Sequence, residues 1–230
     1  MKSLRFTARI ISIFLITIFL SGCGQDWSWH QKLTVSVETP EGLKEGSAVS
    51  EIEVSLLSEN VGLGDFRGSS SSSLKGEAVV VDLGGGRYLF ALLKGYGHET
   101  ALHAFADAGF VPQPKGREAL EKIYGAFETL HATTELSSDR YPLLVTFDDI
   151  DDPASVKRVD PNDFAATFGL GYHLQSITLS ITDEPVTKGK VEAVLRWLGL
   201  QSGRIKPTYK KFADELAVEE TLYAIDFKTR

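Results

Sequence analysis

The chain has 230 residues, enough for one large domain or two small ones with a sizeable buried core. Its hydrophobic content of 43% and charged content of 24% are ordinary for a globular protein and exclude wholesale disorder. The formal net charge is −7, but residues 1–22 carry three basic residues and no acid. The remainder therefore has 21 basic and 31 acidic residues, a net charge of −10. This acidic body lacks the clustered Lys and Arg that bind phosphates, which excludes a nucleic-acid-binding function.

The first 22 residues consist of a basic start and a short apolar run. Lys2, Arg5 and Arg9 precede the run, which covers residues 10–20 and consists mainly of Ile, Phe and Leu. It has about half of the roughly 20 residues that a membrane-spanning helix needs. We therefore expect residues 1–22 to be a secretory signal peptide that is removed, with an uncleaved anchor as the competing interpretation.

The end of this segment, Leu20-Ser21-Gly22-Cys23, resembles the lipobox of bacterial lipoproteins. The resemblance implies that a signal peptidase cuts before Cys23, that its thiol receives a diacylglyceryl group and that the new N-terminus is acylated. Cys23 is the only cysteine, so a lipid there leaves no disulfide. The implied location is a membrane outside the cytoplasm. Gly24 is not the aspartate that favours inner-membrane retention in enteric lipoproteins, so the default is the periplasmic face of the outer membrane, where the cell has one.

Residues 23–32 are expected to form a short lipidated tether, and residues 33–230 a single globular body with a candidate internal boundary near 95–116. The tether contains Trp27 and Trp29. Tryptophans this close to a lipid rest at the level of the headgroups or pack on the folded body, and the sequence leaves both alternatives open.

The N-terminal half of the body is rich in predicted antiparallel strands. Alternating apolar and polar residues predict strands near 33–39 and 48–57. The Gly- and Ser-rich stretch 62–76 is expected to be a surface loop. Two apolar runs joined at 84–86 by three glycines predict a hairpin.

From Gly95 on, the pattern predicts mixed helices and strands. An apolar stripe over 117–130 predicts the clearest helix. Further helices are expected at 98–108, 160–168 and 187–199, the last with Thr187 as N-cap, and strands at 141–147, 174–182 and 220–227. The fold class is therefore α+β, with a β-rich N-terminal half followed by mixed elements. Residues 141–200 also resemble uncharacterised bacterial envelope proteins, a resemblance that carries no activity.

The stretch HETALH, residues 98–103, invites comparison with zinc proteases. Those enzymes place two histidines at positions i and i+4 of a helix so that both face one metal. His98 and His103 are five positions apart, which separates them by about 140° around a helix, against about 40° for the protease motif. The sequence therefore excludes this motif.

The densest acidic cluster follows the strand predicted at 141–147. Asp148, Asp149, Asp151 and Asp152 are weak candidates for a metal site, because calcium prefers clustered oxygen ligands. The cluster lacks the glycine that an EF-hand loop needs, and Asp residues next to Pro commonly form turns and helix caps. We expect turn and cap formation here, and no metal or cofactor.

No phosphate-binding loop, nucleophile elbow or paired-cysteine motif is present. A Ser-His-Asp set brought together from distant residues is recognised by geometry and stays open. The sequence therefore leaves two hypotheses, and it favours the first. The chain is a non-enzymatic binding or assembly module, attached to the membrane through Cys23, that contacts an envelope partner through the loop 62–76 or 148–163. Alternatively, it is an envelope hydrolase with a site built from scattered His, Asp and Ser residues.

Overall fold

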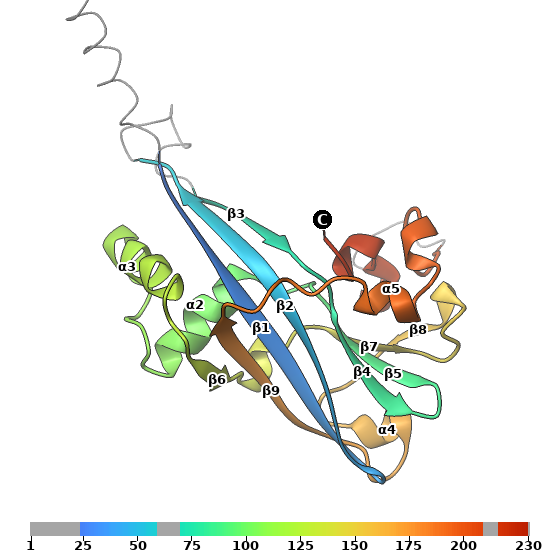
Figure 1. Cartoon of the computed structure of the whole chain (residues 1–230). Coiled ribbons are helices and arrows are strands. Elements are labelled where there is room, and N and C mark those ends of the chain that lie inside the picture. The colour runs from blue at the N-terminus through green and yellow to red at the C-terminus, as the bar shows by residue number, and fades with distance from the viewer. Residues whose placement is uncertain (1–23, 59–69, 209–215, 230) are drawn as a thin grey trace, which may run out of the picture. The chain divides into compact units, whose positions relative to one another are not determined.

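The computed structural model describes residues 24–58, 70–208 and 216–229 (Figure 1). They form two antiparallel sheets with helices that come mainly after the first five strands, which confirms the predicted α+β class. The strands are β1 (Gln25–Thr39), β2 (Gly42–Leu56), β3 (Ser70–Lys75), β4 (Val79–Gly84), β5 (Arg87–Ala91), β6 (Thr133–Glu135), β7 (Leu144–Phe147), β8 (Val156–Arg158) and β9 (His173–Thr182).

The α-helices are α2 (His98–Asp107), α3 (Arg117–Phe127), α4 (Phe164–Phe168) and α5 (Lys190–Val194), and the 3-10 turns are η2 (Ser138–Arg140), η3 (Pro153–Ser155), η4 (Leu198–Leu200), η6 (Val218–Thr221) and η7 (Ala224–Asp226). None of the helices in the described ranges has the length and apolar character that crossing a bilayer requires.

The larger sheet has the strand order β3-β2-β1-β9-β6, so β1 is its central strand. β1 pairs antiparallel with β9, and this register sets Leu33 opposite Leu179 and Val35 opposite Ile177. These four side chains are buried, whereas their neighbours along each strand are more exposed. The sheet therefore has one buried face and one polar face, as the alternation in the sequence predicts.

Helices α2 and α3 contribute aromatic side chains to the buried face. The Phe127 ring on α3 lies 5.7 Å from Phe105 on α2 and 5.0 Å from Trp29 on β1. All three residues are almost fully buried. The predicted helices at 98–108 and 117–130 are thus confirmed, and their apolar stripes form the first part of the core.

The smaller sheet, in the order β4-β5-β7-β8, carries the second part of the core. Phe90 on β5 makes an edge contact with Phe147 on β7 at 5.6 Å, and Phe227 lies 6.1 Å from both rings. Val191 and Leu195 of the α5 region pack on the same cluster. The hairpin between β4 and β5 confirms the prediction, since glycines 84, 85 and 86 all have positive φ angles there.

The described residues divide into two compact units. The smaller one comprises residues 24–27, 53–58 and 70–73, and the larger one residues 28–52, 74–208 and 216–229. In the smaller unit, the Ser73 hydroxyl donates a hydrogen bond of 2.9 Å to the Glu53 carboxylate. A Cβ atom on Gly24 would lie only 2.2 Å from the Leu56 carbonyl oxygen, so the residue just before β1 lies very close to the end of β2.

Two predictions for the N-terminal half differ from the structure. β1 begins at Gln25, so residues expected in the tether belong to the central strand. The stretch Ser70–Lys75, expected in a loop, forms β3 at the edge of the larger sheet. An edge strand accepts polar side chains because only one of its sides must pair, so polarity alone did not identify this strand. Residues 62–69 of the predicted loop lie outside the described residues.

Two predictions for the C-terminal part were also wrong. The helix expected at 187–199 is shortened to α5, and Thr187 does not cap it. The Thr187 N–H donates to the Val49 carbonyl and its hydroxyl accepts from the Val49 N–H, so this residue pairs with β2. The strand expected at 220–227 is replaced by η6 and η7, because the Asp226 carboxylate accepts the Tyr223 N–H and closes a turn.

The close approach of β2 to β4 gives a test of this packing. A Cβ atom on Gly46 would lie 2.1 Å from the Val80 carbonyl oxygen, a backbone atom that cannot move aside cheaply. We expect Gly46→Ala to lower the free energy of unfolding by about 1–3 kcal/mol, the usual cost of overpacking. Urea unfolding measures this change.

Gly199→Ala is the matched control, because the added Cβ atom would meet only the Glu192 carboxylate at 3.7 Å and the φ angle is not positive. This variant should stay within about 0.5 kcal/mol of the wild type. Equal stability of the two variants would contradict the described contact between β2 and β4.

Candidate functional site

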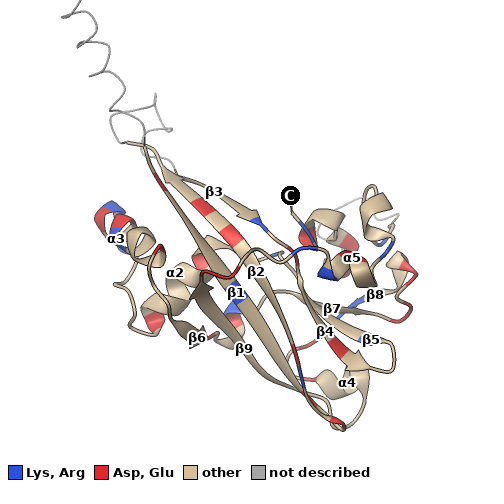
Figure 2. Cartoon of the chain, viewed as in Figure 1, with Lys and Arg blue, Asp and Glu red and all other residues tan. Residues whose placement is uncertain are grey.

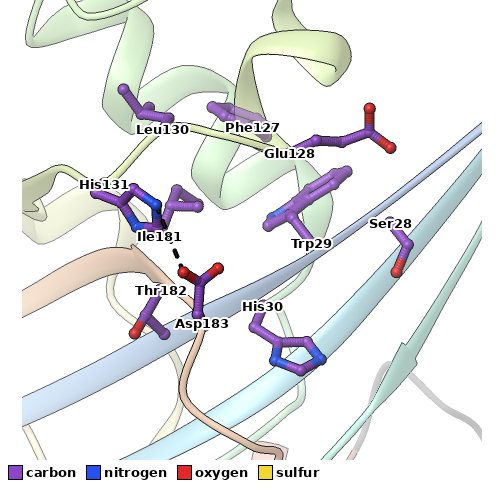
Figure 3. Close-up of a pocket in the computed structure, with 10 residues that line it drawn as sticks. All are labelled: Ser28, Trp29, His30, Phe127, Glu128, Leu130, His131, Ile181, Thr182 and Asp183. Carbon is purple, nitrogen blue, oxygen red and sulfur yellow. Dashed lines mark ion pairs between the residues drawn. The ribbon is translucent and has the colours of Figure 1, made fainter.

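A small cavity of about 230 Å³ lies where β1, the end of α3 and the end of β9 meet (Figure 3). Its apolar wall is formed by Trp29, Phe127, Leu130 and Ile181. Ser28, His30, His131 and Asp183 also line it, so it gathers residue types expected in a scattered hydrolase site. We call it the Trp29 cavity.

Trp29 is held in place by packing and by one hydrogen bond. Its ring stacks on Tyr124 at 5.9 Å with an angle of 15° between the planes. The indole N–H donates to the Gln31 side-chain oxygen at 3.1 Å, and the Gln31 amide donates to the Gly97 carbonyl at 3.4 Å. Of the two alternatives for the tryptophans, packing on the folded body is therefore the correct one for Trp29.

The polar groups of the Trp29 cavity lie on different sides of the sheet. His131 and Asp183 form an ion pair with 3.5 Å between Nε2 and Oδ2, and both side chains are largely exposed. His30 is paired with Thr182 in the β1–β9 register, and its Nδ1 atom lies 2.7 Å from the Glu184 carbonyl oxygen. Since neighbouring positions of a strand face opposite sides, His30 points away from the face that Trp29 occupies.

A nucleophilic site needs a hydroxyl within hydrogen-bond reach of its base. Among the residues that the structure describes, no hydrogen bond joins the Ser28 hydroxyl to His30 or His131. The cavity therefore brings together three of the residue types of a hydrolase without the geometry of a catalytic triad.

His98 and His103 both lie on α2, at the spacing that excluded the protease motif. The His98 ring lies 6.3 Å from the Tyr124 ring. Burial lowers the pKa of His98 below the usual value for histidine, and the negative charge of Glu99 offsets part of this effect. Within the described ranges, no group of three or more His, Cys, Asp or Glu side chains is placed to hold a metal ion.

The lowered pKa of His98 makes stability depend on pH. The unfolded chain binds the proton more readily, so the contribution of neutral His98 is complete above about pH 6.5 and is lost as the pH falls below it. We expect His98→Gln to lose less stability than the wild type between about pH 7.5 and pH 5. Urea unfolding at the two pH values measures the difference.

His173→Gln is the control, because His173 is exposed on β9. It should keep the pH dependence of the wild type. If His98→Gln also keeps it unchanged, the assignment of this dependence to His98 is wrong.

The carboxylates of the acidic cluster bind the backbone of their own loop. Asp149 accepts the Asp151 N–H at 3.0 Å, and Asp152 accepts the Ala154 N–H at 2.9 Å as the N-cap of η3. Asp148 forms an ion pair with Lys157. Further along, Asp163 accepts the Ala166 N–H and caps α4. Of the weak metal candidates, Asp149 and Asp152 thus act as turn and cap residues, and Asp148 is paired with a lysine.

This arrangement predicts that calcium does not bind the loop. Excess calcium should leave the melting temperature of the chain nearly unchanged. If calcium bound the folded state, a calcium concentration of 100 times the dissociation constant would stabilise it by about 2.7 kcal/mol, which a thermal melt detects easily. A rise of several degrees that Asp149→Ala abolishes would establish a metal site and contradict this assignment.

A second site is built where β9 leads into α5. The segment Asp183–Lys188, which we call the crossing segment, passes over β1 and β2 (Figure 1). The Glu184 carboxylate pairs with Lys32 at 2.8 Å, and Thr187 pairs with Val49 as described. After it, the buried Glu77 carboxylate accepts the N–H groups of Gly189 and Lys190, each at 2.9 Å.

Two neighbouring cavities follow, and the first of them lies at the end of the crossing segment. The first, of about 300 Å³, is lined by Lys75, Lys188 and Lys228 with a single acid, Glu51, and we call it the lysine cavity. Lys75 pairs with Glu51 at 3.3 Å, while no ion pair of Lys188 occurs among the described residues. Figure 2 shows basic residues at the end of β3 and beside α5. This local positive charge contrasts with the net charge of −10 of the chain after residue 22.

The second cavity, of about 560 Å³, is lined largely by the C-terminal part of the chain, and we call it the C-terminal cavity. Leu74, Leu198, Ala224 and Ile225 contribute apolar surface to it. Lys228 and Thr229 line both cavities, so the two are neighbours. This pair was not found from the sequence, because its lysines come from three separate segments without a common motif.

Comparison with protein-family models, with curated proteins and with solved structures finds no match to this chain.

Proposed function

We propose that the chain is a lipid-anchored lipoprotein of the bacterial envelope whose body is a non-enzymatic binding module. The observation that carries the proposal is the lipobox ending at Cys23, followed within two residues by the first residue of β1. At about 3.3–3.6 Å per residue, Gln25 stays within roughly 7 Å of the Cys23 Cα atom. A lipid on Cys23 would therefore hold the start of β1 at the headgroups.

Gly24 supports this view of a direct connection. Any side chain at this position would collide with the Leu56 carbonyl. The fold therefore constrains the residue after the cysteine. Because this residue is not aspartate, the default location in the proposal is the periplasmic face of the outer membrane.

Binding is favoured over hydrolysis for two reasons. The hydrolase alternative needs a nucleophile hydrogen-bonded to a base, and the described residues around the Trp29 cavity do not provide that pair. The lysine cavity and the C-terminal cavity, in contrast, offer volume and charge for a ligand. The net charge of −10 is also repelled by anionic headgroups, which leaves the body free to meet a partner or ligand near the membrane.

The anchor is tested by replacing its attachment atom. We expect Cys23→Ser to leave an unprocessed precursor and to abolish labelling by a fatty-acid analogue, because serine lacks the thiol that the lipobox resemblance implies as the acceptor. Labelling of whole cells followed by capture of the protein measures both effects.

Ser21→Ala is the matched control, since it keeps a small residue before the cysteine and should retain the label. Labelling that survives Cys23→Ser would contradict the proposed anchor.

A further inference from the structure

We propose that the lysine cavity and the C-terminal cavity together bind one amphiphile, with an acyl chain in the C-terminal cavity and an anionic phosphate or carboxylate head at the lysines. This inference rests on the proposed binding function and names the ligand class. It does not depend on the lipid at Cys23.

The charge of the lysine cavity selects an anionic head. Lys75, Lys188 and Lys228 line it with Glu51 as its one acid, in a chain whose body is otherwise strongly acidic. Lys75 is paired with Glu51 and Lys228 with Glu192. Lys188 is the ammonium group without an ion pair in the described residues, so an anion can bind it without displacing a carboxylate. Charge-assisted hydrogen bonds from lysine to phosphate or carboxylate are stronger than neutral ones.

The C-terminal cavity suits the apolar part of the ligand. Its volume of about 560 Å³ falls within the range of about 300–1,000 Å³ that small-molecule sites occupy. Ile225, which lines it, is 64% exposed. Leu200, which lies in the chain between the lining residues Gly199 and Gln201, is 88% exposed. Large apolar side chains exposed beside a cavity are an unfavourable surface unless a ligand covers them.

The connection between the cavities fixes the orientation of the ligand. Leu74 lines the C-terminal cavity, and its neighbour Lys75 lines the lysine cavity. Glu192 adds a negative charge to the C-terminal cavity and pairs with Lys228 at the border. An anionic head is thus repelled from the C-terminal cavity and attracted to Lys75 and Lys188, while the chain lies on the apolar side.

The test captures the full chain together with phosphatidylcholine discs and measures how much radiolabelled dodecyl phosphate it binds. Empty discs give the background. Competitors are inorganic phosphate, which has the head alone, and dodecyl maltoside, which has the same chain with an uncharged head. We expect saturable binding that neither competitor reduces at equal concentration. Lys188→Glu and Ile225→Asn should each lower the affinity by about tenfold or more.

Lys115→Glu is the matched control, because it makes the same change of charge at an exposed position between α2 and α3. It should bind like the wild type. Equal competition by phosphate would show a simple anion site, and equal competition by dodecyl maltoside a site without charge selection. Either result, or no saturable binding by the wild type, would overturn the proposal. The assay captures the protein itself, so it measures a chain with no lipid on Cys23 in the same way. The outcome therefore does not depend on the proposed anchor.

Discussion

The antiparallel pairing of β1 with β9 is the interaction on which the rest of the structure depends. It joins residues about 150 positions apart, with Leu33 opposite Leu179 and Val35 opposite Ile177. Closing so long a connection costs chain entropy, which the burial of both apolar rows must offset. Because β1 is the central strand of its sheet, this pairing also sets where Trp29 meets α3 and where the crossing segment begins.

The candidate ligand site follows from the way in which the chain leaves β9. Asp183–Lys188 must cross the polar face of the sheet to reach α5, and it is fixed there through Glu184 and Thr187. This brings Lys188 next to Lys75 and Lys228, which come from β3 and from the C-terminus. The same polar face that lets the segment cross therefore also provides a site in which charges from distant parts of the chain collect.

Much of the fold could be predicted from the sequence, because apolar periodicity reports burial directly. The α3 stripe and the hairpin at Gly84–Gly86 were predicted from such patterns. Ser70–Lys75 could not be predicted as a strand, since its stability comes from pairing with β2 and not from its own side chains. Thr187 was misassigned for the same reason. Its hydroxyl could accept an N–H group of the following helix as a cap, but in the structure it accepts the N–H group of Val49 on β2. The lysine cavity required knowledge of three long-range contacts at once.

We propose that a membrane anchor at Cys23 continues directly into β1, the central strand of the larger sheet. Mass spectrometry of the protein purified from its own cells tests it most directly, because trypsin would release the N-terminal peptide Cys23–Lys32 from a mature chain. We expect this peptide to be the N-terminus and to carry a diacylglyceryl group on the thiol and an acyl group on the amine. A mature chain that starts at another residue, or a peptide with an unmodified Cys23, would contradict it.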